Sequence, residues 1–317
     1  MTTAILCNDI HLGSKLTYQG PHGTTQLDNG AEEYLTALIT KGNNLGAALF
    51  VSNGDGSTLD DDFSSATDRA TRLQEIAKDF HGQWVTGIGN HEPFWALKIL
   101  GLRTETHTLT QTAFQHTDFI MAQPDIDIGN GGMEYTINPD PVVAEIERST
   151  ASNLLVIQHF SALRTTPQGF RTLKSPYGFT PNNAPIRDAL EKKAQQGATI
   201  IQPSGDEHAY IERISPAGVR YLLNPAFTIN SAQDPSKPSA IHNVIREKAD
   251  GSIEFTFEKL ERVNYRGQIT YQSSPVPLAE LTQYCKSKFD PNGFHDNFMN
   301  FEGSQEAVRR AHAALQP

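Results

Sequence analysis

The sequence is poor in cysteine, in long apolar runs and in positive charge. Only two of its 317 residues are cysteines, Cys7 and Cys285, too few for a disulfide framework. We therefore expect a reducing, cytoplasmic setting. No apolar run approaches the roughly 18 residues that a membrane helix requires, and the first residues lack the basic segment of a signal peptide. The sequence thus predicts neither a membrane partner nor secretion.

Acidic residues outnumber basic ones, 36 against 26, which gives a formal net charge of −10 at pH 7. A broad electrostatic contact with nucleic acid depends on many Lys and Arg side chains, so nucleic acid is the less expected partner. An anionic substrate stays compatible with this balance, because bound divalent cations can reverse the local charge of a cleft.

Short apolar runs alternate with helical patterns along most of the chain. Runs of this length suit strands that are buried on both faces of a sheet. The predicted strands cover residues 4–7, 47–51, 84–88, 154–157, 199–201 and 219–223. The predicted helices cover residues 31–40, 67–80 and 186–196. This alternation predicts the α/β class, with a layered core.

Other stretches do not follow this alternation. Residues 101–141 and 161–185 are rich in turn-forming and polar residues, and we expect them to be long loops at the functional rim. Asp250-Gly251 lies between two alternating segments, which predicts a β-hairpin. We expect a main domain over residues 1–240 that carries the functional site. A C-terminal hairpin and helix over residues 241–317 would form an extension packed on that domain.

Polar side chains able to bind metals follow five of the predicted strands. Each group lies where the carboxyl end of its strand is expected, the edge at which open α/β sheets bind ligands. The groups are Asp9 and His11, then Asp55, then Asn90, His91 and Glu92, then His159, and finally Asp206 and His208. Each short motif alone arises often by chance and is compatible with an ordinary loop turn. Five of them in this order predict one shared site.

These residue types are the ones that a site with two metal ions needs. Such a site clamps the attacking and leaving oxygens of a displacement at phosphorus. It requires a carboxylate that bridges both ions, together with terminal imidazole and oxygen ligands. Mixed nitrogen and oxygen ligands suit Mn, Fe, Zn or Co better than Ca. An imidazole just outside the ligand set can assist proton transfer.

The ordered motifs resemble the signature of the calcineurin-like metallophosphoesterase family over about residues 4–230. The resemblance implies a sandwich of mixed β-sheets flanked by helices, and a site for two divalent metal ions. It also implies that a metal-bound hydroxide attacks the substrate. In the implied assignment, Asp9, His11 and His208 hold the first metal, Asp55 bridges, and Asn90, His159 and Asp206 hold the second. His91 would face the leaving group, supported by Glu92.

The sequence departs from the family pattern at Asp206, where the family usually has histidine. A carboxylate is a good metal ligand, so we expect Asp206 to be retained in the ligand set. The site would then carry one positive charge fewer, which favours harder ions such as Mn. The alternative is that Asp206 points away and leaves the second metal weakly bound.

The leading functional hypothesis is two-metal-dependent hydrolysis of a phosphate ester, with a small molecule or a nucleotide as substrate. Whether a monoester or a diester is cleaved stays open. One alternative is a DNA or RNA nuclease, because the segment Asp9 to Gly13 also resembles the opening of nucleases in this superfamily. Another is a catalytically inactive metal-binding scaffold protein. The presence of His91 beside a nearly complete ligand set favours an enzyme.

Overall fold

The computed structural model describes residues 1–13, 15–20, 23–28, 30–56, 63–89, 103, 105–109, 113–129, 132–160, 183–206, 210–231, 234–277 and 279–281. The chain divides into two compact units, and each is treated by itself. Unit 1 comprises Met1–Leu102, Pro225–Ala249 and Ile253–Pro277. Unit 2 comprises Arg103–Asn224, Asp250–Ser252 and Leu278–Pro317.

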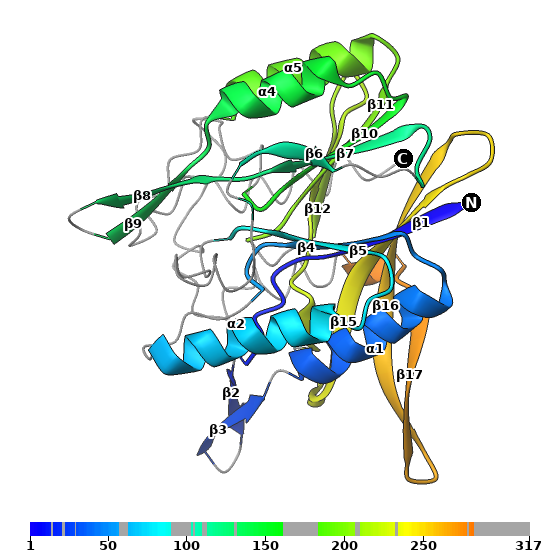
Figure 1. The fold of residues 1–317 in the computed structure, drawn as a ribbon. Coiled ribbons are helices and arrows are strands. Elements are labelled where there is room, and N and C mark those ends of the chain that lie inside the picture. The colour runs from blue at the N-terminus through cyan, green and yellow to red at the C-terminus, as the bar shows by residue number, and fades with distance from the viewer. Residues whose placement is uncertain are drawn as a thin grey trace. The chain divides into compact units, whose positions relative to one another are not determined.

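Unit 1 is built on a seven-stranded mixed sheet (Figure 1). Its strand order is β17-β16-β15-β1-β4-β5, with β14 paired to β15. Strands β1, β4 and β5 run parallel to one another, whereas β15 is antiparallel to β1. The strands are β1 (Thr2–Cys7), β4 (Leu49–Asn53), β5 (Gln83–Gly87), β14 (Thr228–Ser231), β15 (Asp234–Glu247), β16 (Ile253–Tyr265) and β17 (Gln268–Pro275). A separate hairpin is formed by β2 (Lys15–Gly20) and β3 (Gly23–Asp28).

Two helices, α1 (Ala31–Asn44) and α2 (Phe63–Ala77), lie along the same side of this sheet in Figure 1. Helix α1 places Leu35 and Leu38 in one apolar core with residues of β1 and β4. In this core Phe50 of β4 stacks on Trp84 of β5, with ring centroids 4.2 Å apart. Strands β1 and β4 are almost entirely buried, as their continuous apolar runs predict. Their packing fixes where each strand ends.

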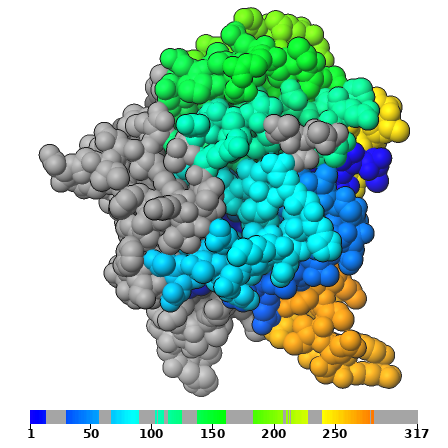
Figure 2. All heavy atoms as spheres, in the orientation of Figure 1, coloured from blue at the N-terminus to red at the C-terminus, as the bar shows by residue number. Residues whose placement is uncertain are grey.

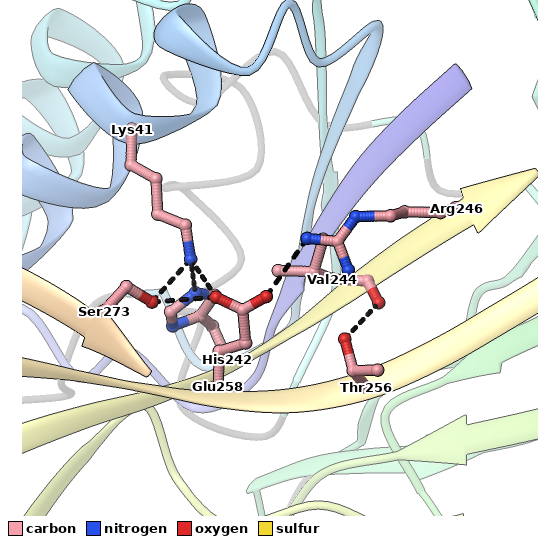
Figure 3. Close-up of polar contacts among 7 residues, drawn as sticks. All are labelled: Lys41, His242, Val244, Arg246, Thr256, Glu258 and Ser273. Carbon is pink, nitrogen blue, oxygen red and sulfur yellow. Dashed lines mark hydrogen bonds and ion pairs between the residues drawn. The ribbon is translucent and has the colours of Figure 1, made fainter. Parts of the chain in front are cut away.

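A polar cluster links α1 to the antiparallel strands of unit 1 (Figure 3). The Lys41 Nζ atom lies 3.0 Å from His242 Nε2, donates to Ser273 Oγ at 2.6 Å and contacts the carboxylate of Glu258. A lysine ammonium can only donate hydrogen bonds, so Nε2 of His242 must accept and the imidazole must be neutral. Arg246 also donates to Glu258, at 3.2 Å.

Burial sets the protonation state of this cluster. Burial, and then the charge of Lys41, lower the pKa of His242 from 6.5 to about 3. Burial raises the pKa of Glu258, but hydrogen bonds from Lys41 and Ser273 outweigh it and bring the value to about 2. At neutral pH the cluster therefore holds a neutral imidazole beside an ionised carboxylate.

Unit 2 contains a six-stranded sheet of order β12-β13-β11-β10-β7-β6, whose central strands are parallel. Helices α4 (Pro139–Arg148) and α5 (Ala184–Gln195) pack against each other and contact this sheet (Figure 1). The strands are β6 (His107–Leu109), β7 (Thr117–Ala122), β10 (Asn153–Gln158), β11 (Thr199–Ser204), β12 (Ile211–Ile214) and β13 (Arg220–Leu223). A separate hairpin is formed by β8 (Asp125–Gly129) and β9 (Gly132–Thr136).

The structure confirms the α/β class, with two mixed sheets flanked by helices. All six predicted strands and all three predicted helices are present, with ends shifted by a few residues. The predicted hairpin is formed by β15 and β16 around Asp250 and Gly251. The division of the chain at residue 240 stays a prediction, and β15 continues across that position. The closing helix expected near the C-terminus lies outside the described residues.

One expectation was wrong. Residues 101–141 are not a single long loop, because they contain β6, β7, β8 and β9 and the start of α4. Strand β7 pairs in parallel with β10, and its apolar residues Phe119 to Ala122 are buried. The surrounding Thr, Gln and His residues obscured this short run in the sequence. The other predicted loop, from residue 161, lies outside the described residues up to residue 182.

The end of the β16–β17 hairpin is exposed, and Figure 2 shows it as an orange projection at the surface. Its residues Tyr265 and Ile269 are 63% and 44% exposed. None of the helices within the described residues is long and apolar enough to cross a membrane.

Candidate metal centre

The carboxyl ends of β1 and β4 bring three of the predicted ligands together. Ligand atoms of Asp9, His11 and Asp55 all lie within 4.8 Å of one another. The His11 Nε2 atom is 3.8 Å from Asp55 Oδ2. Asp9 and Asp55 are 0% and 1% exposed, whereas the His11 side chain is 12% exposed. Among the described residues, this is the one group of three or more acidic, His or Cys side chains with such spacing.

The backbone at these residues has an unusual conformation. Asp9, His11 and Asp55 have φ angles of 51°, 48° and 49°, and Asp206 has 66°. Positive φ is uncommon for residues other than glycine, although Asp and His adopt it more readily than most. Within the described part of the chain only one other non-glycine residue, Arg266, has such a value. Strained backbone of this kind concentrates at functional sites, and here it coincides with four predicted ligands.

Backbone hydrogen bonds hold the two strand-end loops of unit 1 against each other. The His11 N–H donates to the Asp55 carbonyl at 2.8 Å, and the Leu12 N–H donates to the Gly56 carbonyl at 3.0 Å. The Phe227 N–H donates to the Asn8 carbonyl at 2.7 Å from the segment that precedes β14. These bonds fix the positive φ angles and thus the direction in which the carboxylates and the imidazole point.

Gly89, which follows β5, is packed directly against Asp55. A Cβ atom added to Gly89 would lie 2.1 Å from Asp55 Oδ1 and 2.5 Å from Asp55 N. Atoms that are not bonded cannot approach this closely, so a side chain at residue 89 would displace Asp55. The glycine of the Gly89-Asn90-His91-Glu92 motif is therefore needed for close approach between the third loop and the second.

In unit 2, the carboxyl ends of β10 and β11 carry His159 and Asp206. The Gly205 N–H donates to the His159 carbonyl at 2.9 Å, which ties the two loops together. His159 is 1% exposed, and its ring packs edge-on against Phe160 with centroids 4.8 Å apart. Asp206 is half-buried. The sheet edge of unit 2 thus presents one imidazole and one carboxylate.

The remaining predicted site residues, Asn90, His91, Glu92 and His208, lie outside the described residues, and their roles stay predictions. Cys7 is a buried thiol next to this region. Burial, and then the charge of Asp9, raise the pKa of Cys7 well above its ordinary value. The thiol is therefore neutral at physiological pH, in agreement with the interpretation of Cys7 as a core residue rather than a nucleophile.

The donor set of unit 1 suits a divalent cation. Two carboxylates buried beside each other repel, and removing them from water is costly unless positive charge lies close by. An oxygen-rich set completed by imidazole matches Mn, Fe, Zn or Co. The residues present at the ends of β1 and β4 therefore fit a metal ion.

The fold is similar to that of a solved structure, and a second structure aligns more weakly. A dimetal phosphatase from Danio rerio aligns with a TM-score of 0.55 and 12% identity, over 87% of this chain and 99% of that one. Purple acid phosphatase PPD1 from yellow lupin (Lupinus luteus) seeds aligns with a TM-score of 0.49 and 10% identity, over 89% and 55%. No protein-family model and no curated protein matches the sequence. The expected layered α/β fold is thereby confirmed, and at the level of the fold the chain is similar to a dimetal phosphatase.

Proposed function

We propose that this chain is a metal-dependent phosphoesterase that uses two divalent ions. The observation that carries the proposal is the convergence of Asp9, His11 and Asp55 on one point, each held in a strained backbone conformation. The fold shared with a dimetal phosphatase supports the same conclusion. The ligand set proposed is the one expected from the sequence, and Mn is the proposed metal.

Each residue of the proposed metal centre has a distinct role. Asp9 and His11 bind an ion from the loop after β1, and Asp55 reaches it from the loop after β4. When bound, the two ions supply positive charge to the phosphoryl group and make water more acidic. Burial of Asp9 and Asp55 keeps bulk water away from these contacts, which strengthens each electrostatic interaction. His91 is proposed to hold a proton for the leaving group.

The proposed substrate is a phosphate ester of a small molecule or a nucleotide. The acidic balance of the chain disfavours a long polyanion such as DNA or RNA, since binding it without a basic surface is unfavourable. A compact phosphate ester needs only the positive charge at the metal centre. The cytoplasmic location expected from the cysteine content stays a prediction.

Removal and return of metal tests the proposal. Protein stripped with a chelator should be inactive, and reloading with Mn, Zn, Fe(II), Co or Mg should restore hydrolysis of p-nitrophenyl phosphate or bis-p-nitrophenyl phosphate. Asp55→Ala should lower the restored rate by more than about 100-fold, because removal of even a hydrogen-bond partner of a metal ligand costs about 10–100-fold. Asp118→Ala is the matched control, because Asp118 lies in β7 of unit 2 and accepts a hydrogen bond from Ser149.

The results separate the competing functions. Preference for the monoester or the diester substrate would assign the reaction subtype. Two bound ions without turnover of either substrate would favour a scaffold, and cleavage of a labelled oligonucleotide alone would favour a nuclease. A wild-type chain that binds no metal in solution would contradict the proposal altogether.

A further inference from the structure

Two buried asparagines join the loops that carry Asp9 and Asp55. The Asn53 Nδ2 atom donates to Asn8 Oδ1 at 2.8 Å, and the two residues are 0% and 2% exposed. Asn8 immediately precedes Asp9 in the loop after β1. Asn53 is the last residue of β4, two positions before Asp55. Neither residue is among the ligands predicted from the sequence.

This bond lies where the regular strand pairing stops. The parallel ladder between β1 and β4 ends with Cys7 opposite Ser52. Asn8 and Asn53 are the next residues of the two strands, and their side chains link the chains at that point. Beyond them the backbone turns to positive φ at Asp9 and Asp55. The side-chain bond therefore holds the two loops at the last position before they diverge from the sheet.

Backbone hydrogen bonds also hold the segments next to the Asn8–Asn53 bond. The carbonyl of Asn8 accepts from the Phe227 N–H, so the backbone of Asn8 is held from another segment. The His11 N–H donates to the Asp55 carbonyl, two positions after Asp9 in the first loop. The Asn8–Asn53 bond thus joins the two loops just before Asp9, and the His11–Asp55 bond joins them again just after it. A shift at either bond changes the separation of the two carboxylates.

We infer that Asn8 and Asn53 are positioning residues that set the separation of Asp9 and Asp55 and thereby the affinity for metal. The inference rests on the proposed function, because it concerns the same metal centre. Residues that orient metal ligands typically change metal affinity by about 10–100-fold when they are removed. Their contribution differs from that of an ordinary core hydrogen bond, which affects folding and leaves metal affinity unchanged.

Isothermal titration with Mn on chelator-treated protein tests the inference without any measurement of activity. Asn8→Leu keeps the shape of the side chain but removes the acceptor, and it should weaken Mn binding by about 10–100-fold. Asn53→Leu should have the same effect. The double variant should be little worse than either single one, because both substitutions remove one shared bond.

Asn153→Ala is the matched control. Asn153 is 3% exposed, and its Nδ2 atom donates to the Gly251 carbonyl at 2.7 Å and to Thr117 Oγ1 at 3.2 Å. It begins β10 in unit 2, at the strand end opposite to His159. This substitution should lower the free energy of unfolding and leave Mn affinity unchanged. If Asn8→Leu does not fold, Asn8→Ala carries the same expectation, because it also removes the acceptor.

Wild-type Mn affinity in folded Asn8→Leu and Asn53→Leu would overturn the inference and leave the proposed function intact. Additive losses in the double variant would also overturn it, because independent effects are not those of one shared bond. A wild-type chain that binds neither Mn nor any other divalent ion would overturn the proposed function and this inference together.

Discussion

Gly89→Ala is expected to abolish tight metal binding while the protein remains folded. The new methyl group would lie 2.1 Å from Asp55 Oδ1 and 2.5 Å from the backbone nitrogen of Asp55. Rotation of the Asp55 side chain relieves the first clash but not the second, so the loop itself must shift. A displacement of about 1 Å at a reactive centre can cost on the order of 100-fold in rate. Titration with Mn and the rate of phosphate-ester hydrolysis measure the two losses.

Gly82→Ala is the control that separates displacement of Asp55 from steric crowding elsewhere in the unit. Gly82 precedes β5 whereas Gly89 follows it, and a Cβ at Gly82 would lie 2.7 Å from the Ala47 and Ala48 carbonyl oxygens. Both substitutions should therefore lower the free energy of unfolding, by about 1–3 kcal/mol for overpacking. Only Gly89→Ala should lose metal affinity. Equal affinity in the two folded variants would show that the position of Asp55 does not depend on Gly89.

Lowering the pH from 6.5 to 4.5 is expected to destabilise the metal-free protein through His242. This imidazole is neutral in the folded state, where its pKa is about 3, but it gains a proton on unfolding below pH 6.5. The unfolded state then binds more protons, so stability falls as the pH falls. The slope is about 1.4 kcal/mol per pH unit for one proton. Urea unfolding of chelator-treated protein at several pH values measures the free energy of unfolding and therefore this slope.

The chosen interval isolates His242 from its neighbours. Glu258 contributes only at lower pH, because its stabilising charge is lost as the pH falls from 4.5 towards its folded pKa of about 2. His242→Gln should flatten the pH dependence between 6.5 and 4.5, whereas substitution of the exposed His81 by glutamine should not. Parallel curves for wild type and His242→Gln would refute this account.

Local sequence patterns were sufficient to predict the main strands and the loops that follow them. An apolar run such as Ala4 to Cys7 favours a strand buried inside a sheet, and the polar residues after it must lie beyond the end of that strand. Strand β7 shows the limit of such patterns. Its apolar segment is short and surrounded by polar residues, and only pairing with β10, far away along the chain, makes it a central strand.

The sequence by itself determined which side chains are able to bind metal and that they follow strands, because chemistry and hydrophobic periodicity are local properties. The tertiary structure decided how Asp9, His11 and Asp55 meet. Their approach depends on the β1–β4 pairing and on hydrogen bonds between residues that lie more than 40 positions apart in the sequence. It also decided the positive φ angles of the ligands, the need for Gly89 and the Asn8–Asn53 bond. Each of these depends on contacts between segments that are distant in sequence, which no local pattern records.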